Sequence, residues 1–560
     1  MRGFESTMDP RPNFGLGKVK TIDTVLVDWP NGKRTLLTEV KADQTLKLKQ
    51  AEATLTTPAK PAPGPKLFRE LNVLNGVNYR HIENDFIDFD RDRLLYMMLS
   101  TEGPKIAKGD ANGDGREDFY VGGAKDQAGK LFVQKPDGSF ISTNEALFQA
   151  DAICEDQEAL FFDADRDGDQ DLYVCSGGNE FSSSSTALID RLYLNNGSGT
   201  FSKSPQILPT FRFDPTSCVD AADYDRDGDL DLFVGARLAP MVYGVPMNGY
   251  ILNNDGKGNF SDATPQAAPV LQKIGMIKDA QWTDFDGDQD PDLIIVGEWM
   301  PIKLLRNDRG TFTDISEQAG LANTQGWWNC IESADLDGDG DLDYVLGNHG
   351  LNSRFRGNAE HPVVMQVNDF DQNGTVEQIM SVFSGKGTYP MLLRHDLVGQ
   401  IPQLKKRYLK YKDFAEQTVE NIFTPMQLQN TLKYEAKEMR TCVLMNEGKG
   451  KFSLKPLPVE AQLSPNFGIS IKDFDGDKKL DIILGGNFYG VKPEIGRFDA
   501  SYGLFLKGDG KGGFLTIPAR QSGFRLEGEV RDFQVIKIKG KEVLLVARND
   551  EPLQLFEWNP

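Results

Sequence analysis

The sequence predicts an all-β fold, a seven-bladed β-propeller. Two repeated patterns indicate it: a nine-residue acidic loop followed at once by an apolar strand, and a downstream strand, Asn/Gly turn and strand. Repeats with periods of tens of residues are typical of propellers and solenoids. Four short antiparallel strands per repeat make one propeller blade.

The acidic loop occurs seven times, and we number the copies in chain order. They are DANGDGRED (Asp110 to Asp118), DADRDGDQD (Asp163 to Asp171), DYDRDGDLD (Asp223 to Asp231), DFDGDQDPD (Asp284 to Asp292), DLDGDGDLD (Asp335 to Asp343), DFDQNGTVE (Asp369 to Glu377) and DFDGDKKLD (Asp473 to Asp481). Short β-rich runs follow most of them, as at 119–121, 172–174, 232–234 and 482–484, and predict buried strands.

The second repeated pattern, a strand, an Asn/Gly turn and a strand, which we call the strand-turn phrase, begins at Tyr193, Ile251, Leu304 and Val443. Its Asn-Gly and Asp-Gly pairs supply the positive φ angles of a tight hairpin, so each repeat offers about four antiparallel strands.

Loop spacing sets the number of blades. Loops one to five and loop seven each start a blade, and a last unit at 531–558 keeps the strand pattern without the acidic loop, so seven blades are favoured over eight. Loop six follows loop five too closely and is placed on an extra hairpin within the fifth unit, which also holds a helix-patterned insert at about 397–439. Residues 67–100 are expected to supply a strand that closes the ring.

Two domains joined by a linker are expected. Residues 67–560 form the propeller, 51–66 a Pro/Ala-rich linker, and 1–50 the end of a domain too short to bury its own core, so the chain looks truncated at its N-terminus. Residues 1–15 lack the apolar core of a signal peptide.

Charge and composition exclude several classes of partner. The formal charge of -21 argues against nucleic acid or an anionic membrane. No apolar run is long enough for a transmembrane helix. Five scattered cysteines indicate neither a zinc site nor a disulfide framework.

The loops predict calcium sites. Positions 1, 3, 5 and 9 carry carboxylate or amide oxygens and position 7 offers a carbonyl, a set that suits a hard cation with six to eight oxygen ligands. An EF-hand is excluded because position 12 is apolar and lies in a strand. We expect up to about seven structural Ca²⁺ ions. The candidate ligands are Asp110, Asn112, Asp114, Arg116 and Asp118; Asp163, Asp165, Asp167, Asp169 and Asp171; Asp223, Asp225, Asp227, Asp229 and Asp231; Asp284, Asp286, Asp288, Asp290 and Asp292; Asp335, Asp337, Asp339, Asp341 and Asp343; Asp369, Asp371, Asn373, Thr375 and Glu377; and Asp473, Asp475, Asp477, Lys479 and Asp481.

These loops make the chain resemble FG-GAP or VCBS-type repeat proteins, whose repeats bind calcium in the integrin α-subunit propeller. The stretch from Arg2 to Val40 resembles the C-terminal part of an ASPIC/UnbV domain. Together they place the chain with the bacterial ASPIC/UnbV family of FG-GAP proteins. That resemblance implies an exported, cell-surface, outer-membrane or extracellular protein, usually longer than this chain.

The turns on the face opposite the loops are the candidate ligand site, because loops on a rigid scaffold often carry function. Their candidate residues are Asn179, Glu180, Arg237, Glu298, Trp299, Asn348, His349, Asn352, Asn487, Tyr489, Lys492, Arg497 and Asp499. Amide, guanidinium and aromatic groups suit a glycan or protein ligand.

No catalytic motif is evident, so the expected function is a non-catalytic calcium-stabilised binding or scaffold module. The alternative is a calcium-dependent polysaccharide lyase or hydrolase, for which His349, Tyr489 and Lys492 would be the groups to examine.

Overall fold

The computed structural model describes residues 11–56, 66–71, 75–209 and 213–560. Most of the expected linker, residues 57–65, lies outside them. The chain divides into two units, Met1–Gly64 and Pro65–Pro560. In the first, β1 (Thr21–Asp28), β2 (Lys33–Lys41) and β3 (Leu55–Thr56) form one antiparallel sheet in that order. Few of its described side chains are buried, Val40 and Ala53 among them, as expected for so short a segment.

The second unit is built mostly from four-stranded antiparallel sheets. Among the described residues, seven of these sheets form a ring, because their first strands touch in the cyclic order β5, β9, β13, β17, β22, β30, β34 and back to β5. This is a propeller arrangement, and we call the seven sheets blades one to seven. No helix of the described residues is long and apolar enough to cross a membrane.

The strand bounds follow the ring. Blades one to four are β5 (Ile106–Gly109), β6 (Asp118–Val121), β7 (Lys130–Gln134) and β8 (Phe140–Thr143); β9 (Asp156–Phe162), β10 (Asp171–Ser176), β11 (Arg191–Leu194) and β12 (Ser202–Lys203); β13 (Thr216–Ala222), β14 (Asp231–Ala236), β15 (Gly249–Asn254) and β16 (Phe260–Asp262); and β17 (Met276–Thr283), β18 (Asp292–Met300), β19 (Lys303–Asn307) and β20 (Phe312–Asp314), with β21 (Gly326–Trp327) beside β18. Blades five to seven are β22 (Cys330–Ala334), β23 (Asp343–Gly347), β28 (Cys442–Asn446) and β29 (Phe452–Pro456); β30 (Asn466–Lys472), β31 (Asp481–Gly486), β32 (Leu504–Gly508) and β33 (Phe514–Ile517); and β34 (Glu529–Ile538), β35 (Lys541–Asn549), β36 (Gln554–Trp558) and β4 (Phe68–Glu70). Three short helices, α2 (Glu145–Gln149), α3 (Thr264–Ala267) and α7 (Ala519–Ser522), lie in connections between strands.

The core lies between the blades. Each pair of neighbouring blades shares one buried apolar cluster. Between blades two and three, for example, Tyr173 and Leu192 pack with Val234 and Tyr250. Burying such a side chain contributes about 1.5–3 kcal/mol, so the ring is stabilised chiefly where blade meets blade.

The ring is closed by strands from its two ends. β4 pairs antiparallel with β36, Phe68 opposite Trp558. The closing strand thus comes from the part of the chain in which the sequence analysis placed it. Pairing the first strand with the last leaves no open edge at the junction.

Each acidic loop joins the first strand of a sheet to the second, and all seven share one backbone path. The fourth and sixth residues of every loop have φ between 60° and 97°. The sixth residue is glycine in five loops but Gln289 in loop four and Lys478 in loop seven. Glycine adopts this left-handed conformation without the cost that a Cβ atom brings.

Asparagines of the repeated strand-turn phrase tie neighbouring blades together. Asn254 Nδ2 donates to Ala164 O of blade two at 2.8 Å and to Leu230 O of its own blade at 3.0 Å. The equivalent bonds to the preceding blade are made by Asn195 to Ala111 O, Asn307 to Tyr224 O and Asn446 to Phe285 O. The phrase is thus an inter-blade clamp as well as a turn.

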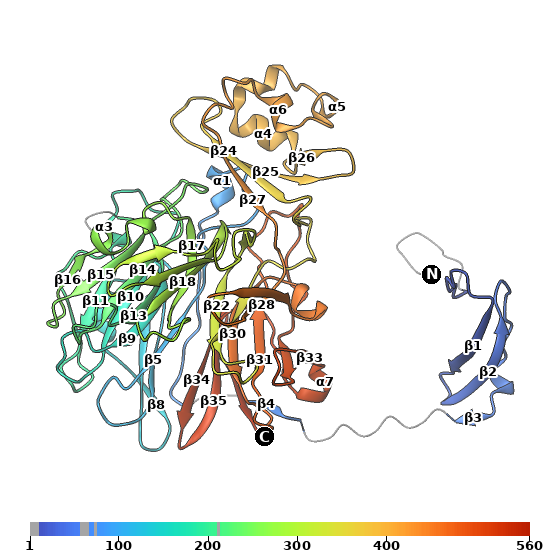
Figure 1. Cartoon of the computed structure of the whole chain (residues 1–560), viewed down its shortest axis with the longest axis horizontal. Coiled ribbons are helices and arrows are strands. Elements are labelled where there is room, and N and C mark those ends of the chain that lie inside the picture. The colour runs from blue at the N-terminus through green and yellow to red at the C-terminus, as the bar shows by residue number, and fades with distance from the viewer. Residues whose placement is uncertain (1–10, 57–65, 72–74, 210–212) are drawn as a thin grey trace. The chain divides into compact units, whose positions relative to one another are not determined.

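Blade five carries an insert at one end of the ring (Figure 1). Its sheet has the order β26 (Thr388–Pro390), β25 (Glu377–Phe383), β24 (Val363–Asn368) and β27 (Leu432–Ala436), and loop six joins β24 to β25 as an extra hairpin. The helices are α4 (Arg394–Gln400), α5 (Tyr411–Phe414) and α6 (Val419–Ile422).

The expectation of a helical insert over 397–439 is therefore wrong in its second half. Helix α6 ends at Ile422, and Leu432–Ala436 is a strand that pairs with β24. Pro425 lacks the N–H that a continuing helix needs, and the edge of β24 offers backbone partners to the following residues.

Replacing Gln289 or Lys478 by glycine should stabilise the protein by about 1 kcal/mol each, because both residues hold a left-handed φ that disfavours a Cβ atom. Thermal unfolding in calcium-containing buffer measures the effect. Gly168→Ala, at the equivalent position of loop two, is the matched control and should lower the midpoint. Unchanged midpoints for both glycine variants would show that the strain is relieved in solution.

Asn254→Ala should lower the free energy of unfolding by about 1–3 kcal/mol, because it leaves the carbonyls of Ala164 and Leu230 without their donor. Asn259→Ala is the control, since Asn259 is exposed and its side chain bonds only Asp255. Equal losses in the two variants would contradict the inter-blade role of Asn254.

Candidate functional site

The first aspartate of each loop closes the loop onto itself. In all seven copies its carboxylate accepts the backbone N–H of the sixth residue, at 2.7–3.2 Å. The N–H of the seventh residue bonds the side-chain oxygen of the fifth in every copy. All seven loops predicted from the repeat thus share these two hydrogen bonds.

The ninth residue anchors the loop in the blade. Asp171 is buried; its Oδ2 accepts Ala164 N at 2.9 Å and its Oδ1 accepts Asn195 N of the third strand at 2.7 Å. Asp118, Asp292, Asp343 and Asp481 have the same two kinds of bond. Each such carboxylate joins the loop, the second strand and the third strand.

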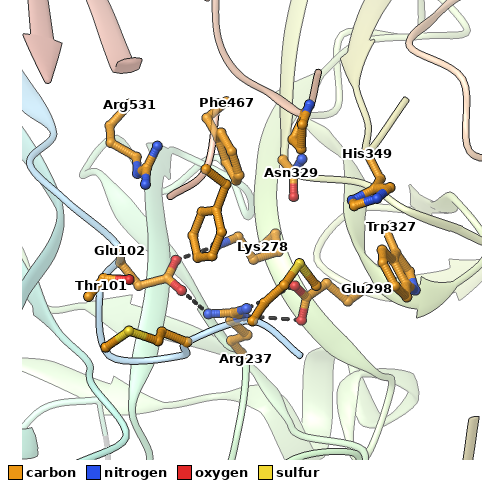
Figure 2. A pocket seen from close by; sticks show the side chains of 14 residues that line it. Thr101, Glu102, Arg237, Lys278, Glu298, Trp327, Asn329, His349, Phe467 and Arg531 are labelled. Carbon is orange, nitrogen blue, oxygen red and sulfur yellow. Dashed lines mark hydrogen bonds and ion pairs between the residues drawn. The ribbon is translucent and has the colours of Figure 1, made fainter. Parts of the chain in front are cut away.

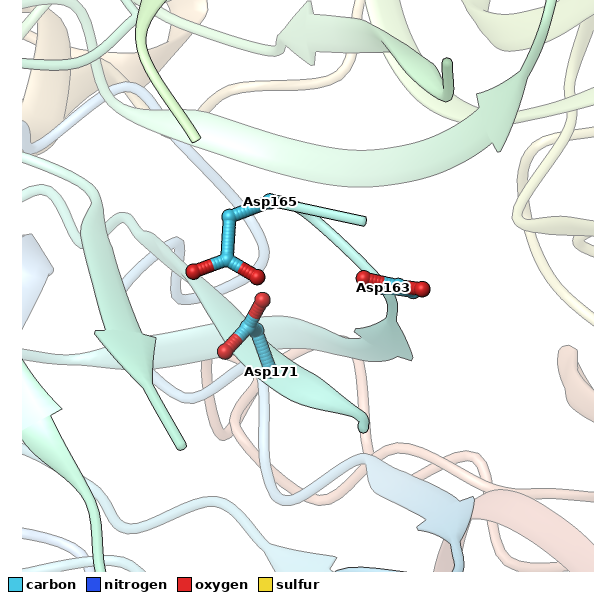
Figure 3. Close-up of side chains that lie close together, drawn as sticks. All are labelled: Asp163, Asp165 and Asp171. Carbon is cyan, nitrogen blue, oxygen red and sulfur yellow. The ribbon is translucent and has the colours of Figure 1, made fainter. Parts of the chain in front are cut away.

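The loop carboxylates converge. In loops two to six, three of them bring ligand atoms within 4.8 Å of one another, and Figure 3 shows Asp163, Asp165 and Asp171 gathered in this way. Several of their buried oxygens have no hydrogen-bond partner, namely Asp163 Oδ1, Asp165 Oδ1, Asp169 Oδ1, Asp229 Oδ1, Asp231 Oδ2, Asp337 Oδ1, Asp371 Oδ1 and Glu377 Oε1. Buried polar atoms are rarely left unpaired, so these clusters have the composition and the unused oxygens to hold metal ions.

Electrostatics supports the same conclusion. Burial, followed by repulsion from neighbours in the loop, raises the pKa of Asp231 and Asp292 to about 8 and that of Asp171 to about 7. A cation at the loop would reverse this trend by favouring the charged carboxylates.

Loops one and seven carry a built-in cation. Lys507 on β32 pairs with Asp475 and, at 2.9 Å, with Asp477 of loop seven. In loop one Arg116 pairs with Asp114. Sequence reasoning missed Lys507 because it lies outside the loop by chain order.

The candidate ligand residues lie at the end of the ring opposite the loops, which we call the mouth. Residues 80–104, the mouth segment, which includes α1 (Asp88–Arg91), run across it. Along its course Glu83 N donates to Asp550 of blade seven, Asp88 accepts from Asn179 of blade two, and Met98 N donates to Gly490 of blade six. The mouth is therefore covered by the chain's own segment.

Most candidate ligand residues take part in this packing. Eight are buried, namely Asn179, Arg237, Glu298, Trp299, Asn348, His349, Asn487 and Lys492; Glu180 and Tyr489 are half-buried; Asn352, Arg497 and Asp499 are exposed. Asn179, Asn348 and Asn487 bond loop backbones, and Lys492 pairs with Asp396 of α4 at 2.9 Å. The structure thus brings the buried ones together as an internal network.

A small cavity of about 30 Å³ lies under the mouth segment. Arg237 stands in it between Glu298, at 2.8 Å, and Glu102 of the mouth segment, and Lys278 also pairs with Glu102 (Figure 2). Burial alone would raise the pKa of Glu298, but Arg237 holds it below its ordinary value. Glu102 and Lys278 were not predicted, because nothing in their local sequence marks a contact across the mouth.

The aromatic candidates pack beside this cavity. Trp299 Nε1 donates to Tyr243 Oη at 2.9 Å, and its ring lies 4.8 Å from that of Trp327. His349 faces Trp327 and bonds Ser353 Oγ at 2.9 Å, and burial lowers its pKa to about 3. A neutral, enclosed imidazole in this position serves packing.

Two of the three exposed candidates, Arg497 and Asp499, lie on the blade-six loop, residues 487–503. The guanidinium of Arg497 lies 5.0 Å from the centre of the Tyr489 ring, and Arg525 lies 4.9 Å from that of Tyr502. Tyr502, 53% exposed, is close enough to Tyr489 to affect its pKa. We call Tyr489, Arg497, Asp499, Tyr502 and Arg525 the blade-six patch.

The central channel, of about 330 Å³, is lined by the inner strands. Three of its carboxylates bridge blades: Asp220, Asp279 and Asp532 accept the N–H groups of Trp282, Ile331 and Ile106 on the next blade. Glu158 pairs with Lys105 at 3.7 Å.

Comparison with known proteins agrees with this architecture. The ASPIC and UnbV family profile matches residues 1–55, and the FG-GAP-like repeat profile matches residues 110–174, 163–234 and 284–346. No curated protein matches the chain.

Solved structures with some similarity include an Agrocybe aegerita lectin described as recognising non-reducing terminal N-acetylglucosamine, with 17% identity and a TM-score of 0.39 over 76% of this chain and 82% of the lectin. YCF48 from Cyanidioschyzon merolae is similar at 9% identity and a TM-score of 0.38, over 83% of this chain and 98% of its own. The V. cholerae biofilm matrix protein Bap1 is similar at 10% identity and a TM-score of 0.34, over 89% and 92%. The family matches confirm the resemblance seen in the sequence: the chain carries an ASPIC and UnbV segment followed by FG-GAP-like repeats.

Proposed function

We propose that the chain is a non-catalytic binding module, a seven-bladed propeller stabilised by calcium in its acidic loops and working at a cell surface or outside the cell. One observation carries the proposal: in loops two to six, three carboxylates converge on one point, and each of these loops except loop four leaves at least one buried oxygen without a partner. An ion supplies the missing partner.

Calcium fits the loops better than other common metals. Their side-chain ligands are carboxylate and amide oxygens, which favour a hard cation over zinc or copper. Five or more oxygens offered by each nine-residue loop suit the large, variable coordination shell of Ca²⁺ better than the strict octahedron of Mg²⁺. Extracellular modules bind Ca²⁺ with dissociation constants of about 10⁻⁴–10⁻³ M, matching its level outside cells.

Removing calcium with excess EDTA should lower the unfolding temperature substantially, because an ion that binds only the native state stabilises it by mass action. Millimolar CaCl₂ should restore the midpoint, and MgCl₂ should restore it less. A midpoint that EDTA leaves unchanged would overturn the calcium proposal.

The number of bound calcium ions should fall by one when a ligand is removed from a single loop. Asp231→Asn removes a buried ligand with an unpartnered oxygen and should reduce the bound calcium by one equivalent. Asp262→Asn, an exposed aspartate at the end of β16 in the same blade, is the control and should leave the count unchanged.

The blade-six patch is the proposed ligand surface, since the mouth cavity has room for only one or two water molecules. Its exposed tyrosine ring and the two guanidinium groups suit stacking against a sugar and hydrogen bonding to its hydroxyl or carboxylate groups. The same groups are enriched where proteins bind proteins.

A glycan array on the calcium-loaded protein, followed by titration of the best oligosaccharide, tests this surface. Tyr502→Ala should weaken binding at least tenfold, as expected when an exposed aromatic anchor is lost. Tyr411→Ala is a matched control, because Tyr411 is 54% exposed and also has an arginine, Arg394, near its ring, but lies on the insert. Equal affinity of the Tyr502→Ala variant would exclude the patch.

The same titrations address catalysis. His349 is enclosed beside Trp327, Lys492 is paired with Asp396, and Tyr489 lies against Arg497, so the three groups considered for a lyase serve separate contacts. This supports the non-catalytic proposal. Shortened oligosaccharides after long incubation would favour the lyase or hydrolase instead.

A further inference from the structure

A second kind of acidic cluster lies at the mouth, away from the acidic loops. It consists of Glu83 of the mouth segment, Glu155 just before β9, and Glu180 in the turn that follows β10. Loop two begins at Asp163, at the other end of β9. At about 3.3 Å per residue, the seven residues of β9 separate this cluster from loop two by roughly 20 Å.

Glu155 is the buried centre of the cluster. It is 0% exposed, and its Oε2 accepts the backbone N–H of Lys125 at 2.6 Å. Its Oε1 is buried without any hydrogen-bond partner. Leaving a buried carboxylate oxygen unpaired is costly, which calls for a ligand at that point.

The other two glutamates contribute similar oxygens. Glu180 Oε1 accepts from Asn84 Nδ2 at 2.9 Å, whereas its Oε2 is buried and unpaired. Glu83 Oε1 is also buried and unpaired. Three carboxylates from three separate segments thus each leave one buried oxygen unused.

The geometry around Gly178 brings two of them together. A Cβ atom on Gly178 would lie 2.9 Å from Glu180 Oε2 and 3.3 Å from Glu155 Cβ. Burial, then Glu83 and Glu180, raise the pKa of Glu155 well above its ordinary value. Glu83 lies beside the same group, because Asn84, the next residue in the chain, bonds Glu180 Oε1.

The nearby cationic side chains, Lys125 and Arg531, form their ion pairs with other carboxylates. Among the ion pairs of the described residues, none involves Glu83, Glu155 or Glu180. Lys125, whose backbone N–H bonds Glu155, pairs through its side chain with Asp126 at 2.7 Å, and Arg531 pairs with Glu529 at 2.9 Å.

We propose that Glu83, Glu155 and Glu180 bind one divalent cation of the calcium class, and that this ion fastens the mouth segment to blade two. Oxygen-only ligands and three negative charges in a buried place are the features that such an ion requires. The ion would link residues far apart in the chain, which the ions of the acidic loops do not.

The test counts calcium in the full chain by equilibrium dialysis and elemental analysis. Glu155→Gln should lower the count by one equivalent relative to the unsubstituted protein while all acidic loops remain intact. Glu332→Gln is the control, because Glu332 lines the central channel, where burial raises its pKa to about 8, and belongs to neither kind of cluster; its count should not change.

A second variant keeps the test decisive if the Glu155→Gln protein does not fold. Glu83 lies outside the sheets, so Glu83→Gln should keep the ring intact, lower the count by one and speed cleavage of the mouth segment by trypsin in saturating calcium. An unchanged count in a folded Glu83→Gln protein would overturn the proposal and show that the carboxylates share protons instead. If only the Asp231→Asn variant loses calcium, and neither glutamate variant does, the loop proposal is supported and the mouth-segment cation site is rejected.

Discussion

The structure depends on a buried carboxylate at the ninth position of each acidic loop. In five loops this group accepts one N–H from its own loop and one from the third strand, as Asp171 does from Ala164 and Asn195. Asp231 of loop three has only the bond to the third strand, and Glu377 of loop six only the bond to its own loop. Burial works against the charge of Asp171 and raises its pKa. Positive charge nearby favours the ionised carboxylate that accepts both bonds. In loop seven Lys507 supplies it, and in loops two to six the remaining carboxylates gather around a place where an ion can do so.

The repeat made much of the fold predictable. Seven loops in phase mark the junction of first and second strands, and the Asn/Gly phrase marks the later hairpin, because both depend on local backbone geometry. The clamp made by Asn254 was not predictable in the same way, since its partner Ala164 O lies in the preceding blade. The strand at 432–436 was missed because its charged sequence suits a helix, and only the free edge of β24 makes it a strand.

The turns chosen from the sequence do lie at one end of the ring, but most of their candidate residues are buried in internal contacts. Sequence reasoning recognised polar and aromatic residues in turns at one end of the ring. It could not foresee that residues 80–104 would cross that end and form hydrogen bonds or ion pairs with Asn179, Arg237 and Lys492. Contacts between segments hundreds of residues apart leave no periodic signal. In the blade-six patch Arg497 and Asp499 are exposed and Tyr489 is half-buried beside Arg497.

Blade seven shows why the other sheets need acidic loops. It has no acidic loop, and its first two strands join through a turn of two residues, Lys539 and Gly540, both with positive φ. Such a turn matches the twist of its strands and satisfies its own backbone, so the hairpin is stable without help. A nine-residue loop instead exposes many backbone groups and needs several carboxylates to bond them. Those carboxylates repel one another, and the proposed cation would offset this repulsion.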